Sequence, residues 1–112
     1  MNEVVLRGRV HRAQTYGDRL VGLMFAFHWP PDYDVLVFDR CRSVHTCFTF
    51  VRPDLIFLDP EHRVLKGVVK APPWRIHIGP SRTASVLEVQ SGIAPRGLKT
   101  GDLLSLEEIA NR

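Results

Sequence analysis

Three residues near the middle of the chain have side chains that bind transition metals. Cys41, His45 and Cys47 form the pattern C-x-x-x-H-x-C. On an extended strand, His45 and Cys47 lie on the same face and could share one ion. Zinc takes four ligands in a structural site, or three and a water in a catalytic one, and His62 or Asp59 could complete the set. Metal binding through Cys41, His45 and Cys47 is therefore one hypothesis for the function.

The other interpretation is that Cys47 is a small apolar residue of a buried strand. The chain has 2 cysteines, and the C-x-x-C spacing common in zinc sites is missing. Cysteine is also among the residue types most often buried. We favour this interpretation, so the sequence predicts no bound metal and no other cofactor.

Residues 92–100, GIAPRGLKT, are similar to a phosphate-binding loop. A P-loop needs a lysine directly after its second glycine and a helix after that. Here Leu98 separates the glycine from the lysine, and Gly101 would break a helix, so a phosphate would lack the amide groups of a helix N-terminus. We interpret the segment instead as a short helix from Ser91 to Gly97 followed by a turn.

Five polar residues are the candidate ligand-binding residues: Arg19, His45, Thr46, Asp54 and Asp59. They could gather at one end of the fold, where loops meet and binding sites are common. For Arg19 we favour a structural role, because a buried arginine needs a partner, and Asp54 or Asp59 could hold it against the sheet. A second alternative is a hydrolase-like enzyme using His45 and Asp54, although no G-x-S-x-G nucleophile pattern is present and we assign no catalytic residue.

The elements that must position these residues are mostly short strands separated by glycine and proline. We expect strands over residues 4–12, 34–39, 44–51, 54–59, 63–70, 74–79, 83–90 and 101–106. A helix is expected over residues 15–27, with Thr15 as its N-cap. In residues 74–79, apolar residues alternate with Arg75 and His77, which predicts an edge strand or a half-exposed strand.

This pattern predicts a mainly β fold, either a single antiparallel β-sandwich or a partly closed barrel, with one or two short helices. The helical segments are too few to cross over between parallel strands. A length of 112 residues suits a single domain over residues 1–112.

The composition argues against several classes of partner. The net charge is +3, and acidic residues are interspersed, so no basic block indicates nucleic acid. No apolar run is long enough to span a membrane, and 2 cysteines are too few for a disulfide framework. We therefore expect a cytoplasmic protein with reduced thiols, as a monomer or weak homodimer.

Several short motifs occur together in a specific order and spacing. They are Ala13, Thr15, Arg19, Gly22-Leu23-Met24, Leu36-Val37-Phe38, His45-Thr46, Phe48, Asp54, Phe57-Leu58-Asp59, Val64, Pro72, Leu87-Glu88, Gly92 and Gly101-Asp102. In this set the chain resembles the family called domain of unknown function 192, over about residues 13–106. The resemblance implies a jelly-roll β-sandwich standing alone as one domain, and it implies no reaction.

The sequence departs from the family pattern at a few positions. Thr49-Phe50 stands where a methionine commonly follows Phe48, and Cys41 and Cys47 are not part of the pattern. The sequence as a whole therefore favours a non-enzymatic binding module for a protein or a small polar ligand, with the hydrolase and metal-binding hypotheses as alternatives.

Overall fold

The computed structural model describes residues 2–13, 28–47 and 50–109, and these residues form nine strands and no helix. The strands are β1 (Glu3–Gly8), β2 (Val10–Arg12), β3 (Val35–Asp39), β4 (Ser43–His45), β5 (Asp54–Leu58), β6 (Val64–Val68), β7 (Ile76–Ile78), β8 (Ser85–Val89) and β9 (Leu103–Glu108). The mainly β class is confirmed. The helix predicted for residues 15–27, with Arg19, lies outside the described residues.

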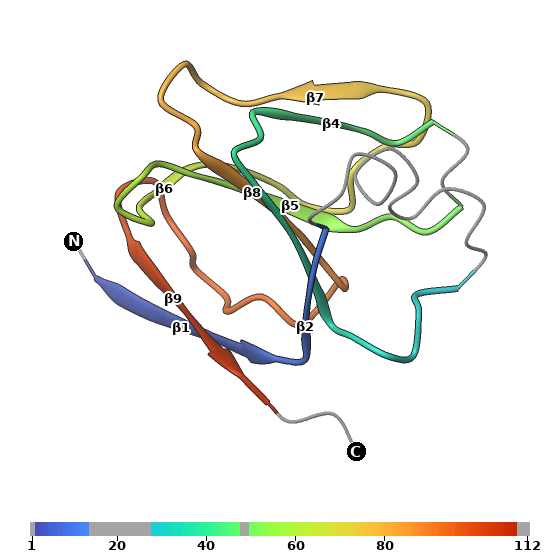
Figure 1. The fold of residues 1–112 in the computed structure, drawn as a ribbon, viewed down its shortest axis with the longest axis horizontal. Helices are drawn as coiled ribbons and strands as arrows, with labels where there is room; N and C mark the ends of the chain where they lie inside the picture. The colour runs from blue at the N-terminus through green and yellow to red at the C-terminus, as the bar shows by residue number, and fades with distance from the viewer. Residues whose placement is uncertain (1, 14–27, 48–49, 110–112) are drawn as a thin grey trace.

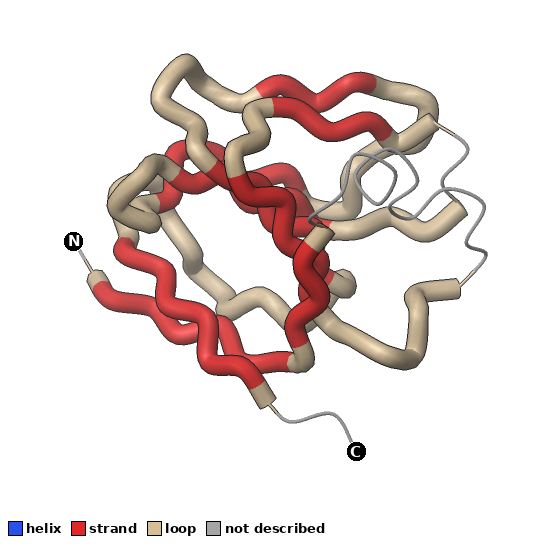
Figure 2. The backbone as a smooth tube through the Cα atoms, viewed as in Figure 1, coloured by secondary structure: helices blue, strands red, loops and turns tan. Residues whose placement is uncertain are grey.

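Five strands form a central sheet in the order β2-β3-β8-β5-β6. β1 and β9 pair with each other in a second sheet, and β4 and β7 form a third. In Figure 1, β1 and β9 lie below the central strands while β4 and β7 lie above them, and Figure 2 shows the same arrangement as strands joined by long loops.

Each face of the central sheet has its own apolar core. The first core joins β1 and β9 to the sheet through Leu6, Val35, Val37, Ile56, Leu58, Val64, Leu87, Val89 and Leu104. The second core joins β4 to the opposite face through Ala13, Leu36, Phe38, Val44, Leu55, Phe57, Ala71 and Val86. Strands covered on both faces need apolar residues at consecutive positions, which is why β3, β5 and β8 are mostly apolar.

The antiparallel arrangement expected for the sheets is met only in part, and the barrel alternative is not formed by the described strands. A fully antiparallel arrangement was expected, but β1 pairs with β9 and β2 pairs with β3 in parallel. Apolar alternation fixes which face a side chain takes and carries no information about strand direction. The sheets of the described residues also do not close into a barrel, because β1–β9 and β4–β7 remain separate two-stranded sheets.

Two predicted elements are shorter or absent. β4 ends at His45, so only the beginning of the strand expected over residues 44–51 is formed among the described residues. The short helix expected from Ser91 to Gly97 is a series of turns. Gly92 and Gly97 have φ angles of 92° and 75°, a left-handed conformation that interrupts a right-handed helix.

The passage from β1 to β2 is fixed by Asp34. The Asp34 carboxylate accepts a hydrogen bond from the Arg9 amide at 2.8 Å and from the Arg9 guanidinium at 3.0 Å and 3.2 Å. The Arg9 guanidinium lowers the pKa of Asp34 through these hydrogen bonds, against the effect of partial burial. This contact holds the chain where it leaves the β1–β9 sheet and enters the central sheet, and Gly8 leaves room for it, since an added Cβ would lie 3.1 Å from the Asp34 Cβ.

The packing of the loop between β7 and β8 leads to a testable prediction. A Cβ added at Gly79 would lie 2.5 Å from the Phe57 ring, in the second core, and equally close to the Thr83 side chain. We expect Gly79→Ala to destabilise the protein by about 1–3 kcal/mol in urea unfolding, because the Phe57 ring must shift.

Gly67→Ala is the matched control. The nearest heavy atom to an added Cβ there is the Leu55 carbonyl oxygen at 3.9 Å, an ordinary contact. This variant should unfold at the wild-type urea concentration or slightly above it. Equal midpoints for the two variants would contradict the close packing at Gly79.

Candidate functional site

Several loops meet at one end of the central sheet. In the register of the sheet, Val35 of β3, Val89 of β8 and Asp54 of β5 lie side by side. The segments that precede β3 and β5 and the segment that follows β8 therefore gather there, and we call it the Asp54 end. Loops held by a rigid sheet are a common place for binding residues.

A pocket of about 490 Å³ lies at the Asp54 end, between β5, β6 and residues 91–100. Its apolar wall includes Val68, Val69 and Leu98, and Leu98 packs against the first core. The polar residues around the pocket are Asp54, Ser91, Arg96 and Thr100. A concave apolar surface of this volume with a few polar groups is typical of small-molecule sites.

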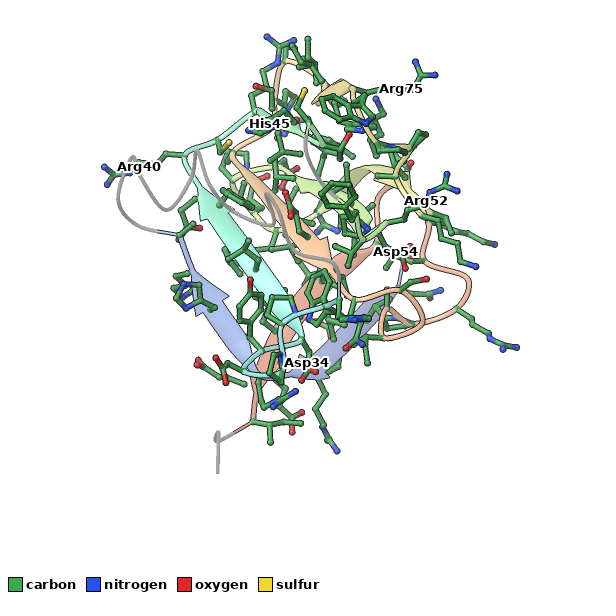
Figure 3. All side chains as sticks on the ribbon, turned by 90° about the vertical axis from the view of Figure 1, so that its right-hand side faces the viewer. Asp34, Arg40, His45, Arg52, Asp54 and Arg75 are labelled. Atoms are coloured by element: carbon green, nitrogen blue, oxygen red, sulfur yellow. The ribbon has the colours of Figure 1, made fainter. Side chains whose placement is uncertain are left out.

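Asp54 is the carboxylate of this pocket. It is half-buried at the start of β5, and its side chain is labelled in Figure 3. Its Oδ1 atom accepts a hydrogen bond from the Lys70 amide at 2.8 Å. Within the described part of the chain, no donor lies within hydrogen-bonding distance of Oδ2. As far as the described residues show, the second oxygen can accept from an ammonium group or another donor of a ligand.

His45 and Thr46 lie on a different sheet, at the end of β4. Thr46 is buried, its hydroxyl donates to the Pro72 carbonyl at 2.6 Å, and the Arg75 amide donates back to that hydroxyl at 3.1 Å. The half-buried His45 ring accepts a hydrogen bond through Nδ1 from the Cys47 amide at 3.2 Å. The geometry gives Thr46 a structural function, holding β4 to the chain before β7.

Asp59 lies beyond the opposite end of β5 from Asp54. The two residues are five positions apart along the chain, which in an extended strand is about 17 Å of backbone. Asp59 is buried, and its Oδ1 atom accepts from the amides of Glu61 and Arg63, both at 2.9 Å. Its Oδ2 atom lies 3.6 Å from the guanidinium of Arg82. Asp59 thus organises the predicted turn into β6.

The five predicted site residues do not form one cluster in the described structure. His45 and Thr46 are neighbours, Asp54 lies in the pocket, and Asp59 is at the other end of β5. Arg19 lies outside the described residues. Figure 3 places His45 near the top of the molecule and Asp54 well below it.

Cys41, His45 and Cys47, the residues of the metal-binding alternative, form no metal site in the described part of the chain. No group of three or more His, Cys, Asp or Glu side chains in the described ranges could hold an ion. The Cys41 thiol donates to the Ser43 carbonyl at 3.0 Å, and both cysteines are half-buried and reduced. These positions agree with small polar or apolar roles at the ends of β4.

Sequence reasoning named Glu88 only as part of the Leu87-Glu88 motif and gave it no role. It is the fourth of the five residues of β8, between Leu36 of β3 and Leu55 of β5, and is 4% exposed. No hydrogen bond or ion pair to its carboxyl group is found among the residues that the structure describes, and burial raises its pKa to about 8. The available signal was a single acidic residue inside the apolar run SVLEV.

The pKa of Tyr33 is also raised by burial near Glu88. Burial, and then the charge of Glu88, raises the pKa of Tyr33 to about 12. The Tyr33 ring packs against the second core and lies edge-on to Trp29, with 5.8 Å between ring centroids. Glu88 therefore lies beneath the Asp54 end, on the face of the sheet opposite the first core.

The fold and the pocket define a small β-rich protein with a concave site at one end of its central sheet. The chain belongs to the family called domain of unknown function 192, described as uncharacterised ACR, whose family model matches residues 2–106. The resemblance noted from the motifs is thereby confirmed. The family description names no activity. Among the described residues, no helix is long and apolar enough to span a membrane.

Three related proteins are similar to this chain. The UPF0127 protein PH1112 of Pyrococcus horikoshii is 38% identical over 98 residues, covering 82% of this chain and 76% of that protein. A protein of unknown function from Novosphingobium aromaticivorans has a TM-score of 0.70 and 28% identity, covering 84% of this chain and 71% of that one. A putative transcription regulator from Sinorhizobium meliloti 1021 has a TM-score of 0.67 and 27% identity, covering 84% and 78%.

The buried carboxyl group of Glu88 leads to a prediction about pH. Its ordinary pKa of 4.5 is raised to about 8 in the folded protein, so the folded state keeps a proton that the unfolded state loses. Stability from this group is therefore greatest below pH 4.5 and falls as the pH rises toward 8, by roughly a few kcal/mol. Glu88→Gln should remove this dependence, so that the difference between variant and wild-type melting temperatures grows in favour of the variant from pH 5 to about pH 8.5.

Glu108→Gln, at an exposed residue of β9, is the control and should follow the wild type at every pH. A buried glutamine has its own cost in stability at every pH. The informative quantity is therefore how the difference between variant and wild-type melting temperatures changes with pH. A constant difference between Glu88→Gln and wild type would show that the Glu88 carboxyl group does not titrate abnormally.

Proposed function

We propose that the protein is a non-enzymatic binding module that holds a small ligand in the pocket at Asp54. The observation that carries the proposal is the half-buried Asp54 carboxylate at the edge of an apolar pocket of about 490 Å³, with no partner for its Oδ2 atom among the described residues. A cytoplasmic location and the jelly-roll type of sandwich remain predictions from the sequence.

The pocket favours a ligand with an apolar body and a protonated amine. The apolar body would contact Val68, Val69 and Leu98, which removes apolar surface from water on both sides. The ammonium group would donate to Asp54 Oδ2, and a charge-assisted hydrogen bond of this kind is stronger than a neutral one. This arrangement gives the ligand both its affinity and its orientation.

Two other predicted site residues lie away from this pocket and bind the protein's own backbone. The Thr46 hydroxyl and the Asp59 carboxylate are occupied by the protein's own backbone groups, so neither is available in the way that Asp54 Oδ2 is. A hydrolytic reaction needs a nucleophile and a base within hydrogen-bond reach of each other. Asp54 has the Lys70 amide as its hydrogen-bond partner, which suits binding and gives no base beside a nucleophile.

The test compares two ligands of similar size and opposite charge. Tryptamine should produce saturable chemical-shift changes at residues around the pocket in ¹⁵N-edited NMR spectra, whereas indole-3-propionate should bind at least about tenfold more weakly. Asp54→Asn keeps the acceptor for the Lys70 amide and removes the charge, so the variant should fold normally and lose most of its preference for tryptamine.

Asp39→Asn is the control, because Asp39 is an exposed carboxylate at the other end of β3 from the pocket. Its tryptamine titration should match the wild type. The proposal fails if tryptamine does not bind at the pocket residues, or if Asp54→Asn and Asp39→Asn bind both ligands equally well.

A further inference from the structure

The outer edge of β7 has backbone groups without partners in the described structure. β7 pairs with β4 only, and Figure 1 shows β7 as the outermost strand with β4 beneath it. The Thr46 amide donates to the Arg75 carbonyl and the Gly79 amide donates to the Arg42 carbonyl, each at 2.8 Å. Hydrogen-bonded pairs alternate along an antiparallel ladder. The residues on either side of Ile76 and Ile78 are therefore the ones whose backbone groups point toward β4.

The amide and carbonyl groups of Ile76 and Ile78 consequently point away from β4. The Ile78 carbonyl accepts a hydrogen bond from Lys66 Nζ at 3.2 Å. The Ile76 amide, the Ile76 carbonyl and the Ile78 amide have no other protein partner among the residues that the structure describes. A short edge of this kind can accept an additional strand.

The side chains of the same strand expose an apolar surface. Trp74, Ile76 and Ile78 are 59%, 69% and 55% exposed. They face outward because His77 takes the inward position, with its Nε2 atom 3.4 Å from both the Thr46 hydroxyl and the Pro72 carbonyl. Alternation along the strand then places both isoleucines on the outer face.

The segments that contain β4 and β7 carry positive charges only. Residues 40–47 and 72–82 contain Arg40, Arg42, Arg75 and Arg82 and contain no aspartate or glutamate. All four arginines are exposed, and Figure 3 shows Arg40 and Arg75 projecting away from the molecule. The four positive charges exceed the net charge of +3 of the whole chain. Arg82 pairs with Asp59 and Glu61 of a neighbouring loop, at 3.6 Å and 3.8 Å.

This combination identifies the kind of partner. A second copy of the chain would bring four more arginines to the same place and would be repelled. Single-stranded nucleic acid needs a series of aromatic residues for base stacking, and on β7 and its flanks only Trp74 provides one. Arginine and tryptophan beside aliphatic residues are enriched in protein–protein interfaces, and guanidinium groups pair well with carboxylates.

We propose that β7 binds an extended acidic segment of a partner protein by strand addition. The backbone of the segment pairs with Ile76 and Ile78, its apolar side chains at alternate positions pack on the exposed isoleucines, and its carboxylates pair with the arginines. Pro73 and Pro80 flank β7 and cannot donate backbone hydrogen bonds, so the edge accepts one short segment and does not extend into open-ended association.

The probe is a fluorescein-labelled heptapeptide with aspartate and valine alternating, and the comparison peptide has lysine in place of aspartate. In fluorescence-polarisation titrations of the full chain, the acidic peptide should bind and the lysine peptide should not. The double substitution Ile76→Ser and Ile78→Ser should weaken binding at least about tenfold. The matched control is Val5→Ser with Ile93→Ser, which changes two exposed apolar residues away from β7 and should have no effect.

Backbone pairing is tested without changing the protein. One version of the acidic peptide carries N-methyl groups on the valine amides, and another carries them on the aspartate amides. Strand addition requires every second amide, so one version should lose binding and the other should keep it.

Equal binding of the two methylated peptides would overturn strand addition. Absence of binding by the acidic peptide would overturn the proposal. The proposal would also be overturned if the peptide does not bind while anionic lipid vesicles or an oligo-deoxythymidine do, and if that binding depends on Ile76 and Ile78.

Discussion

The structure depends on a central sheet that must be covered on both faces. β3, β5 and β8 are buried along nearly their whole length, so each face needs its own apolar layer. The first core is completed by β1 and β9, and the second core contains Val44 of β4. Because apolar side chains cover both faces of the central sheet, polar groups in the described structure lie mostly at the strand ends, on the outer faces and along the sheet edges. Both the pocket at Asp54 and the edge of β7 follow from this constraint.

Glu88 is the exception, since it is a carboxyl group placed within the sheet. Removing a carboxylate from water without a partner is costly, and the group responds by holding its proton. The nearby Tyr33 hydroxyl likewise keeps its proton to about pH 12, so the buried layer beneath the Asp54 end is neutral over the ordinary pH range below about 8. A neutral layer lets Asp54 act as the negative group of the pocket without repulsion from a second charge.

The sequence predicted the central strands well and the arrangement of the sheets poorly. Continuous apolar runs such as residues 54–59 reflect burial on both faces, which is a local property of the chain. The parallel pairing of β1 with β9 depends on residues about a hundred positions apart, and alternation does not encode it. The turns at residues 91–97 were mistaken for a helix because a serine cap and a terminal glycine also occur in turns. β7 was predicted as an edge strand. The sequence did not predict that His77 would be buried and Ile76 exposed.

The candidate site shows the same limit, because Asp54, Asp59 and Thr46 have equal capacity to bind a ligand or a backbone group. Only their surroundings distinguish them, and these come from segments that the sequence keeps apart, such as Lys70 beside Asp54 and Pro72 beside Thr46. The segment from Val69 to Trp74 also joins the two proposed sites, since Val69 lines the pocket and Trp74 begins the apolar edge.

Coupling between those sites would require this segment to adopt two arrangements. Ala71, at its centre, is fully buried, and its amide donates to the Pro53 carbonyl at 2.7 Å. Lys70, next to it, is held to Asp54 by its own amide, in a left-handed conformation with a φ angle of 48°. A connection fixed at two consecutive residues transmits little movement, so the physical expectation is that the pocket and the β7 edge bind their partners independently.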